Sequence, residues 1–123
     1  MSIRMTEHLF SYGTLQKENV QRDLFGRTLP GTADVLRGYR IATVEITDEA
    51  FLSTGEEKFQ KTLVCSHDKN DMVAGTLLEM TNAELLITDK YEPANYKRTT
   101  VGLESGKTAW IYVTVERSEH KKL

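Results

Sequence analysis

The stretch TNAELLITDKYEP, residues 81–93, carries the strongest secondary-structure signal in the chain. Thr81 is a favourable N-cap residue, and Glu84 follows it at the spacing of a capping box. Pro93 lacks a backbone N–H and disfavours helical geometry in the residue before it, so the helix is expected to end at Glu92. The sequence therefore predicts a helix whose last residue is a glutamate.

Strand-like segments lie on both sides of this helix. They are rich in β-branched and aromatic residues and are separated by polar or glycine-containing turns. The predicted strands cover residues 8–12, 35–43 (with a bulge at Gly38), 62–65, 72–78, 96–103 and 108–115. A short helix is expected over residues 16–25, where Gly26 would end it, and a charged loop over residues 47–62.

The order of these elements is β, short α, β, β, β, α, β, β, which is typical of an α+β domain with a mostly antiparallel sheet. Residues 1–123 contain no repeat or linker, so one domain is expected. Its sheet is predicted to curl into a compact mixed β-barrel with short helices. The two ends, residues 1–7 and 116–123, are expected to be flexible.

The charge and cysteine content limits the classes of partner. Sixteen Lys and Arg against eighteen Asp and Glu give a net charge of −2, which argues against binding to nucleic acid or to anionic membranes. Cys65 is the single cysteine, and no secretory leader is apparent, so a cytoplasmic location is expected. No apolar run approaches the roughly 20 residues of a membrane-spanning helix. The sequence gives no indication of oligomeric state.

The usual metal and cofactor patterns are missing from the sequence. His8, His67 and His120 lie in separate segments, which does not favour a metal site. Cys65 lies in an apolar strand, where a small buried side chain is the simpler interpretation than a nucleophile. The glycine-rich nucleotide loops and the Gly-x-Ser-x-Gly hydrolase motif are also absent. We therefore expect neither a metal nor a cofactor.

Two features are candidates for chemistry, and the first is the turn Tyr12-Gly13-Thr14-Leu15 after the first strand. A turn from strand to helix leaves successive backbone N–H groups without partners. Glycine permits the positive φ that would aim these groups at one point, where they would bind an anion. An ordinary turn is the alternative interpretation.

The second feature is Glu92. A carboxylate at the C-terminal end of a helix is disfavoured by the helix dipole, so the group is expected to hold its proton more tightly there. If Tyr91 and Pro93 exclude water, desolvation acts in the same direction and suits the group to proton transfer. The alternative is a solvated glutamate at a helix end.

These motifs together resemble the γ-glutamylcyclotransferase-like family, also called AIG2-like. The resemblance covers residues 8–15 and 73–113. The opening FSYGTL resembles the family's aromatic Tyr-Gly-Thr/Ser-Leu loop. A later helix that ends in Asp-x-x-Glu, followed by a Tyr-x-Arg strand, corresponds here to Asp89, Glu92, Tyr96 and Arg98.

The resemblance implies an enzyme that cyclises a small γ-glutamyl amide to 5-oxoproline and releases an amine. It implies that Tyr12, Gly13, Thr14 and Leu15 bind the glutamyl carboxylate and that Glu92 is the general base and acid. Asp89, Tyr96 and Arg98 would be supporting residues. The leaving amine stays open between an amino acid, a glutathione-like peptide, a simple amine and an isopeptide remnant. A non-catalytic module that binds a small carboxylate is the alternative function.

Overall fold

The computed structural model describes residues 6–47, 49–53, 55, 58–94 and 96–114. The elements follow in the order β1 (Thr6–Ser11), the 3-10 turn η1 (Thr14–Gln16), α1 (Glu18–Phe25), β2 (Gly31–Arg37), β3 (Tyr39–Glu45), α2 (Glu49–Leu52), β4 (Phe59–Cys65), β5 (Met72–Thr81), α3 (Asn82–Tyr91), β6 (Tyr96–Gly102) and β7 (Thr108–Thr114).

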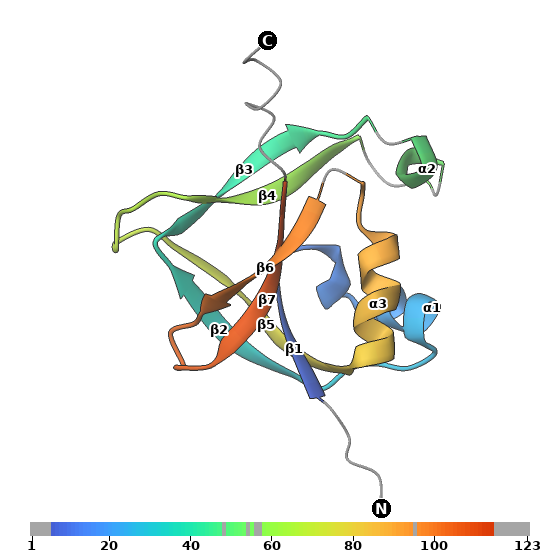
Figure 1. Ribbon diagram of the computed structural model, residues 1–123, viewed down its shortest axis with the longest axis horizontal. Coiled ribbons are helices and arrows are strands. Elements are labelled where there is room, and N and C mark those ends of the chain that lie inside the picture. Colours follow the sequence, from blue (N-terminus) through green and yellow to red (C-terminus); the bar gives the residue numbers. More distant parts are fainter. Residues whose placement is uncertain (1–5, 48, 54, 56–57, 95, 115–123) are drawn as a thin grey trace, which may run out of the picture.

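A five-stranded sheet has the strand order β2-β5-β1-β7-β6, and β3 pairs with β4 in a separate two-stranded sheet. The pairing is antiparallel except between β1 and β7, which run parallel. Figure 1 shows α1 and α3 on one side of the larger sheet and the β3–β4 pair across the other end of the molecule.

β1 lies at the centre of the large sheet and is buried on both faces. Leu9 and Phe10 are each 1% exposed, and adjacent strand residues point to opposite faces. Leu9 packs in a cluster with Leu85 of α3, whereas Phe10 packs in a cluster with Leu63 of β4. The helices therefore cover one face of β1 and the β3–β4 pair covers the other, which explains why the adjacent residues Leu9 and Phe10 are both apolar.

The predicted helix over residues 81–92 is confirmed as α3. The Glu84 N–H donates to Thr81 Oγ1 (3.1 Å), and the Thr81 N–H donates back to Glu84 Oε1 (2.9 Å), which completes the capping box. Glu92 is the C-cap residue, with φ −69° and ψ 148°. The helix therefore ends where Pro93 requires it to end.

Two predictions about the middle of the chain are wrong. The strand expected over 35–43 is two strands, β2 and β3, because Gly38 adopts a left-handed φ of 82° and ends the first one. The segment expected to be a loop over 47–62 contains α2 and the first residues of β4. Charged side chains in this segment suggested a loop, yet strand residues with one exposed face are often charged.

The predicted barrel is also wrong, because the two sheets do not close on each other. β4 contacts β7 through a side chain: Thr62 Oγ1 accepts a hydrogen bond from the backbone N–H of Thr114 at 3.1 Å. This contact takes the place of a backbone ladder between the sheets. The coarser prediction of an α+β fold with a mostly antiparallel sheet is confirmed.

The expected flexible ends lie mainly outside the described residues, while Thr6 and Glu7 belong to β1. None of the helices in the described ranges combines the length and the apolar character that crossing a membrane requires. The cytoplasmic location stays a prediction.

Candidate active site

The chain leaves β1 at Ser11 and turns at once into η1. The Gln16 N–H donates to the Gly13 carbonyl (3.2 Å), and the Lys17 N–H donates to the Thr14 carbonyl (2.9 Å). The buried side chain of Gln21 of α1 also holds the turn, because its Nε2 donates to the Leu15 carbonyl at 2.9 Å. Among the hydrogen bonds of the described residues, none uses the backbone N–H of Thr14 or of Leu15. These two donors are available to a ligand.

The expected positive φ at Gly13 is wrong. Gly13 has φ −135° and ψ −142°, outside the left-handed region. The 3-10 turn starts directly from extended chain, so the N–H groups after it are left unbonded without a left-handed residue. A Cβ atom built on Gly13 would meet nothing within 4 Å, so the residue borders open space.

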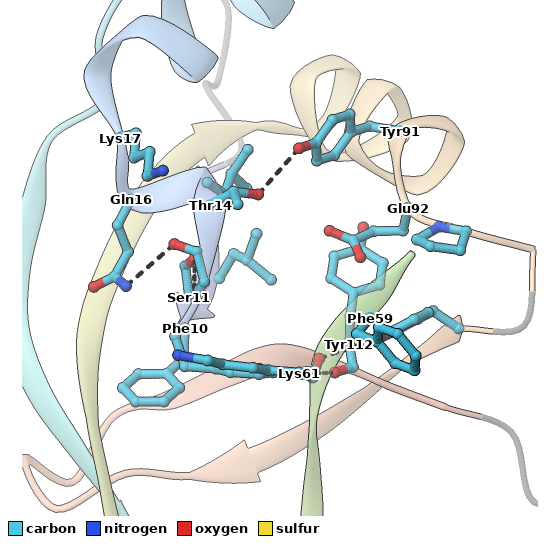
Figure 2. A pocket seen from close by; sticks show the side chains of 16 residues that line it. Phe10, Ser11, Thr14, Gln16, Lys17, Phe59, Lys61, Tyr91, Glu92 and Tyr112 are labelled. Atoms are coloured by element: carbon cyan, nitrogen blue, oxygen red, sulfur yellow. Dashed lines mark hydrogen bonds between the residues drawn. The ribbon is translucent and has the colours of Figure 1, made fainter. Parts of the chain in front are cut away.

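That space is a cavity of about 510 Å³. Residues 12–17 form one side of it, residues 91–93 at the end of α3 form another, and Phe59 and Lys61 of β4 contribute a third. Figure 2 shows Thr14 and Glu92 on facing sides of this cavity. The structure therefore brings together the loop and the glutamate that the sequence singled out separately.

Glu92 is half-buried and points into the cavity (Figure 2). Its backbone N–H donates to the Thr88 carbonyl at 3.0 Å, which anchors the residue to the last turn of α3. Its side chain lies close enough to Tyr12, Tyr96 and Tyr112 for its charge to affect all three phenols. Burial is the main cause that raises the pKa of each phenol, and the negative charge of Glu92 adds to it.

The hydroxyls of the cavity tyrosines are held in hydrogen bonds. Tyr12 donates to the Tyr112 carbonyl (2.8 Å), and Tyr96 donates to the Lys61 carbonyl (2.9 Å). Thr14 Oγ1 shares a 3.0 Å hydrogen bond with the Tyr91 hydroxyl, which links the loop directly to the end of α3. These bonds join the walls of the cavity, which come from η1, α3, β4, β6 and β7.

A second cluster lies behind Tyr112. Asp89 accepts two hydrogen bonds from Arg98 (2.7 and 2.9 Å) and one from the Tyr112 hydroxyl (2.5 Å). The Arg98 guanidinium lies 4.3 Å from the Trp110 ring centre. Partial burial disfavours the Asp89 carboxylate, but the hydrogen bonds from Arg98 and Tyr112 outweigh it and hold the pKa of Asp89 below its usual range.

The supporting residues expected from the sequence thus separate into two groups. Tyr96 lines the cavity with Glu92, whereas Asp89 and Arg98 do not line it and reach it only through Tyr112. The described residues contain no group of three His, Cys, Asp or Glu side chains that could hold a metal ion.

Sequence reasoning missed several residues that line the cavity, namely Gln16, Lys17, Phe59, Lys61, Tyr91 (considered only as a neighbour of Glu92) and Tyr112. Lys17 and Tyr91 are adjacent to the two motifs and could have been included on that ground. Phe59 and Lys61 lie in the segment expected to be a loop, so their shared strand face was not recognised. Tyr112 follows the alternation of an ordinary core strand, and no local signal distinguishes it.

Two unbonded backbone N–H groups face a carboxyl group across this cavity, an arrangement suited to a small molecule with an acidic group and a titratable group. The family model described as gamma-glutamyl cyclotransferase, AIG2-like, matches residues 9–123. The chain therefore belongs to the γ-glutamyl cyclotransferase, AIG2-like family, as the sequence motifs predicted.

Several solved structures share this fold. One Arabidopsis thaliana protein, solved in solution, is similar with a TM-score of 0.69 at 21% identity, over 99% of this chain and 76% of its own. A second Arabidopsis thaliana protein gives a TM-score of 0.70 at 22% identity, and the match covers 95% of this chain and 73% of that protein's chain. A structure named gamma-glutamyl cyclotransferase gives a TM-score of 0.69 at 14% identity, and the match covers 91% of this chain and 68% of that structure's chain. No curated protein matches the sequence.

Proposed function

We propose that this protein is a γ-glutamylcyclotransferase that converts a γ-glutamyl amide into 5-oxoproline and a free amine. The observation that carries the proposal is the shared cavity: the loop after β1 and Glu92 after α3, far apart in the sequence, both line it. Membership of the family supports the same reaction.

In this proposal the loop holds the α-carboxylate of the glutamyl group. The N–H groups of Thr14 and Leu15 are unbonded within the described residues, and a carboxylate that accepts two N–H donors is held in both position and orientation. The link between Thr14 and Tyr91 keeps these donors at a constant distance from the end of α3. The anchored glutamyl chain then folds back so that its α-amine reaches its own γ-carbonyl.

The reaction forms one bond and breaks one bond, without water. The α-nitrogen attacks the γ-carbonyl carbon to close a five-membered lactam, and the amide C–N bond to the leaving amine breaks. The α-ammonium loses two protons on its way to the lactam N–H: Glu92 takes one and delivers it to the departing nitrogen, and the second ends on the released amine, so no net proton is gained. Holding the two reacting ends in line lowers the barrier by several kcal/mol. In the best-aligned intramolecular reactions the gain reaches about 7 to 11 kcal/mol.

The tetrahedral intermediate also needs a hydrogen-bond donor for its oxyanion. The Tyr12 hydroxyl already donates to the Tyr112 carbonyl, which favours a backbone N–H of the loop over Tyr12 in this role. The Gly13 N–H reaches Ser11 Oγ only at 3.5 Å, so it is weakly held and is the best candidate.

The direct test is to incubate the protein with a panel of γ-glutamyl amides and to quantify 5-oxoproline and the released amine by mass spectrometry. The proposal expects both products in equal amounts. Glutamate in place of 5-oxoproline would indicate hydrolysis and contradict cyclisation. Tight substrate binding with no product would instead support the non-catalytic carboxylate-binding module.

A further inference from the structure

A chain of hydrogen bonds leads from β5 to the loop that the proposed function assigns to the carboxylate. Thr76 Oγ1 donates to Gln16 Oε1 at 2.8 Å, and Gln16 Nε2 donates to the Gly13 carbonyl at 3.2 Å. A carbonyl oxygen can only accept, so the Gln16 amide nitrogen faces Gly13 and its amide oxygen faces Thr76. Both polar atoms of the Gln16 side chain are therefore bonded, although the residue is exposed.

The Gly13 carbonyl determines where the next backbone N–H points. The peptide between Gly13 and Thr14 is planar and trans, so the Thr14 N–H points opposite to the Gly13 carbonyl. That carbonyl accepts from both the backbone N–H and the side chain of Gln16. Figure 2 shows Gln16 and Glu92 on opposite sides of Thr14. The bonds from Gln16 therefore direct the Thr14 N–H toward the side of the loop that faces Glu92.

The strand β5 holds Thr76 level with the start of this loop. Thr76 pairs with Ser11, the last residue of β1, in the antiparallel ladder between the two strands. A Cβ atom built on Gly31 of β2 would lie 2.8 Å from Thr76 Cγ2, so this glycine leaves the space that the threonine methyl group needs. A β-branched side chain has few χ1 rotamers. With its methyl group beside Gly31, Thr76 keeps its hydroxyl directed at Gln16.

Two amide groups are thus joined head to tail, the Gln16 side chain and the peptide between Gly13 and Thr14. In each of them the oxygen accepts a hydrogen bond, which polarises the amide and makes its N–H a stronger donor. The chain ends at the Thr14 N–H, which none of the hydrogen bonds of the described residues uses. A carboxylate bound there meets a donor that is fixed in direction and strengthened by its neighbours.

We infer, on the basis of the proposed function, that Thr76 is a positioning residue for the substrate carboxylate. It does not line the cavity and acts through Gln16, which orients the peptide between Gly13 and Thr14. Removal of the Thr76 hydroxyl frees the Gln16 amide to rotate away, and the Gly13 carbonyl then keeps only its backbone donor. The loss is confined to ligands that carry the carboxylate.

Two matched ligands isolate this contact. 5-Oxoproline and 5-oxoprolinamide share the lactam ring and differ only in the carboxylate, which an amide replaces in the second. NMR titration of the backbone amides gives the ratio of their Kd values, which we expect to favour 5-oxoproline by about tenfold or more in the wild type. Thr76→Val keeps the methyl group and removes the hydroxyl, so the ratio should fall by about threefold or more. Thr76→Ser keeps the hydroxyl and should retain most of the preference.

A double-mutant cycle tests the route through Gln16. Gln16→Met removes the amide, keeps the length of the side chain and should lower the ratio at least as much as Thr76→Val. Adding Thr76→Val to Gln16→Met should lower it no further, because the hydroxyl then has no amide to hold. Thr32→Val, on the exposed surface of the neighbouring strand β2, is the control and should leave the ratio unchanged.

The outcomes separate the inference from the proposed function. An unchanged ratio in Thr76→Val, an equal loss of affinity for both ligands, or a further loss in the double variant would overturn the inference and leave the carboxylate site standing. A wild type without a preference for 5-oxoproline, whether it binds both ligands equally or neither, would contradict the carboxylate site of the proposed function and the inference with it.

Discussion

At the scale of single residues, the site depends on groups whose charge state is fixed by their neighbours. Burial and the charge of Glu92 raise the pKa of the Tyr12, Tyr96 and Tyr112 phenols further above neutrality than their ordinary value. They therefore present neutral hydrogen-bonding walls at physiological pH, and proton transfer falls to Glu92 in the proposed reaction. Asp89 is held as a carboxylate by Arg98 and Tyr112 behind this wall.

Gly13 and Gly75 make a matched pair of glycine substitutions. Gly13→Val adds a side chain in open space at a negative φ, so we expect the free energy of unfolding to change by less than about 1 kcal/mol. The added side chain occupies space next to the carboxylate donors, so KM should rise at least about tenfold. Gly75→Ala places a Cβ 2.5 Å from the Ser11 carbonyl oxygen and should destabilise the fold by about 1 to 3 kcal/mol. Urea denaturation and steady-state kinetics measure both effects, and an unchanged KM in folded Gly13→Val would argue against the loop as a substrate site.

The Asp89 cluster predicts a pH-dependent stability. The pKa of Asp89 is lower in the folded protein than in the unfolded chain, where it is about 3.9. The ionised carboxylate therefore contributes its full stabilising free energy above about pH 3.9, and this contribution is lost as pH falls through the folded-state pKa. Asp89→Asn should therefore cost about 1 to 2 kcal/mol at pH 7, a figure reduced for the group's 32% side-chain exposure. The difference from the wild type should shrink as pH falls below about 4. Denaturant titrations over pH measure it, with Asp23→Asn on the exposed surface of α1 as control; a cost that is constant with pH contradicts the assignment.

At the scale of elements, α3 sets the position of Glu92. Its start and its end are fixed by local signals, Thr81 with Glu84 at one end and Pro93 at the other, and this is why the sequence predicted it. The break between β2 and β3 was harder to predict, because a glycine in a strand pattern is consistent with either a bulge or a turn. β4 was missed in part because its charged residues obscure the alternation.

Removing the N-cap of α3 tests this element. Thr81→Ala loses the side-chain acceptor for the Glu84 N–H and should lower the free energy of unfolding by about 1 kcal/mol. Urea denaturation should show a lower midpoint with an unchanged slope. Thr100→Ala, on the exposed surface of β6, should change the free energy of unfolding by less than about 0.5 kcal/mol. Equal effects of the two substitutions would contradict the capping role.

At the scale of the whole molecule, the cavity exists because β1, β4 and α3 converge. The two motifs were recognised from the sequence, but the claim that they meet came from the family resemblance, since no local pattern encodes contacts between distant segments. Lys61 and Phe59 were missed for the same reason. The barrel was predicted wrongly because closure depends on long-range strand pairing, and at Thr62 and Thr114 a side-chain contact takes its place.

The hydrogen bond from the Thr114 N–H to Thr62 Oγ1 is expected to hold the β3–β4 pair against β7. Thr62 is 4% exposed, and Thr62→Val leaves the Thr114 N–H without its acceptor, at a cost of about 1 to 3 kcal/mol. A two-stranded sheet is marginally stable alone, so the β3 and β4 amides should exchange hydrogen faster than those of β1 and β5. Hydrogen-exchange NMR measures this, with Thr43→Val on the exposed surface of β3 as control. A uniform increase over all strands would contradict a local role for the contact.

The proton-transfer role of Glu92 is tested by the kcat of Glu92→Gln on a γ-glutamyl amide that the wild type cyclises. This substitution preserves the shape of the side chain and removes its ability to transfer a proton. We expect kcat to fall by about a hundredfold to ten-thousandfold with an unchanged unfolding midpoint. Glu79→Gln, on the exposed surface of β5, should retain full activity. A folded Glu92→Gln variant that forms 5-oxoproline at the wild-type rate would contradict the account.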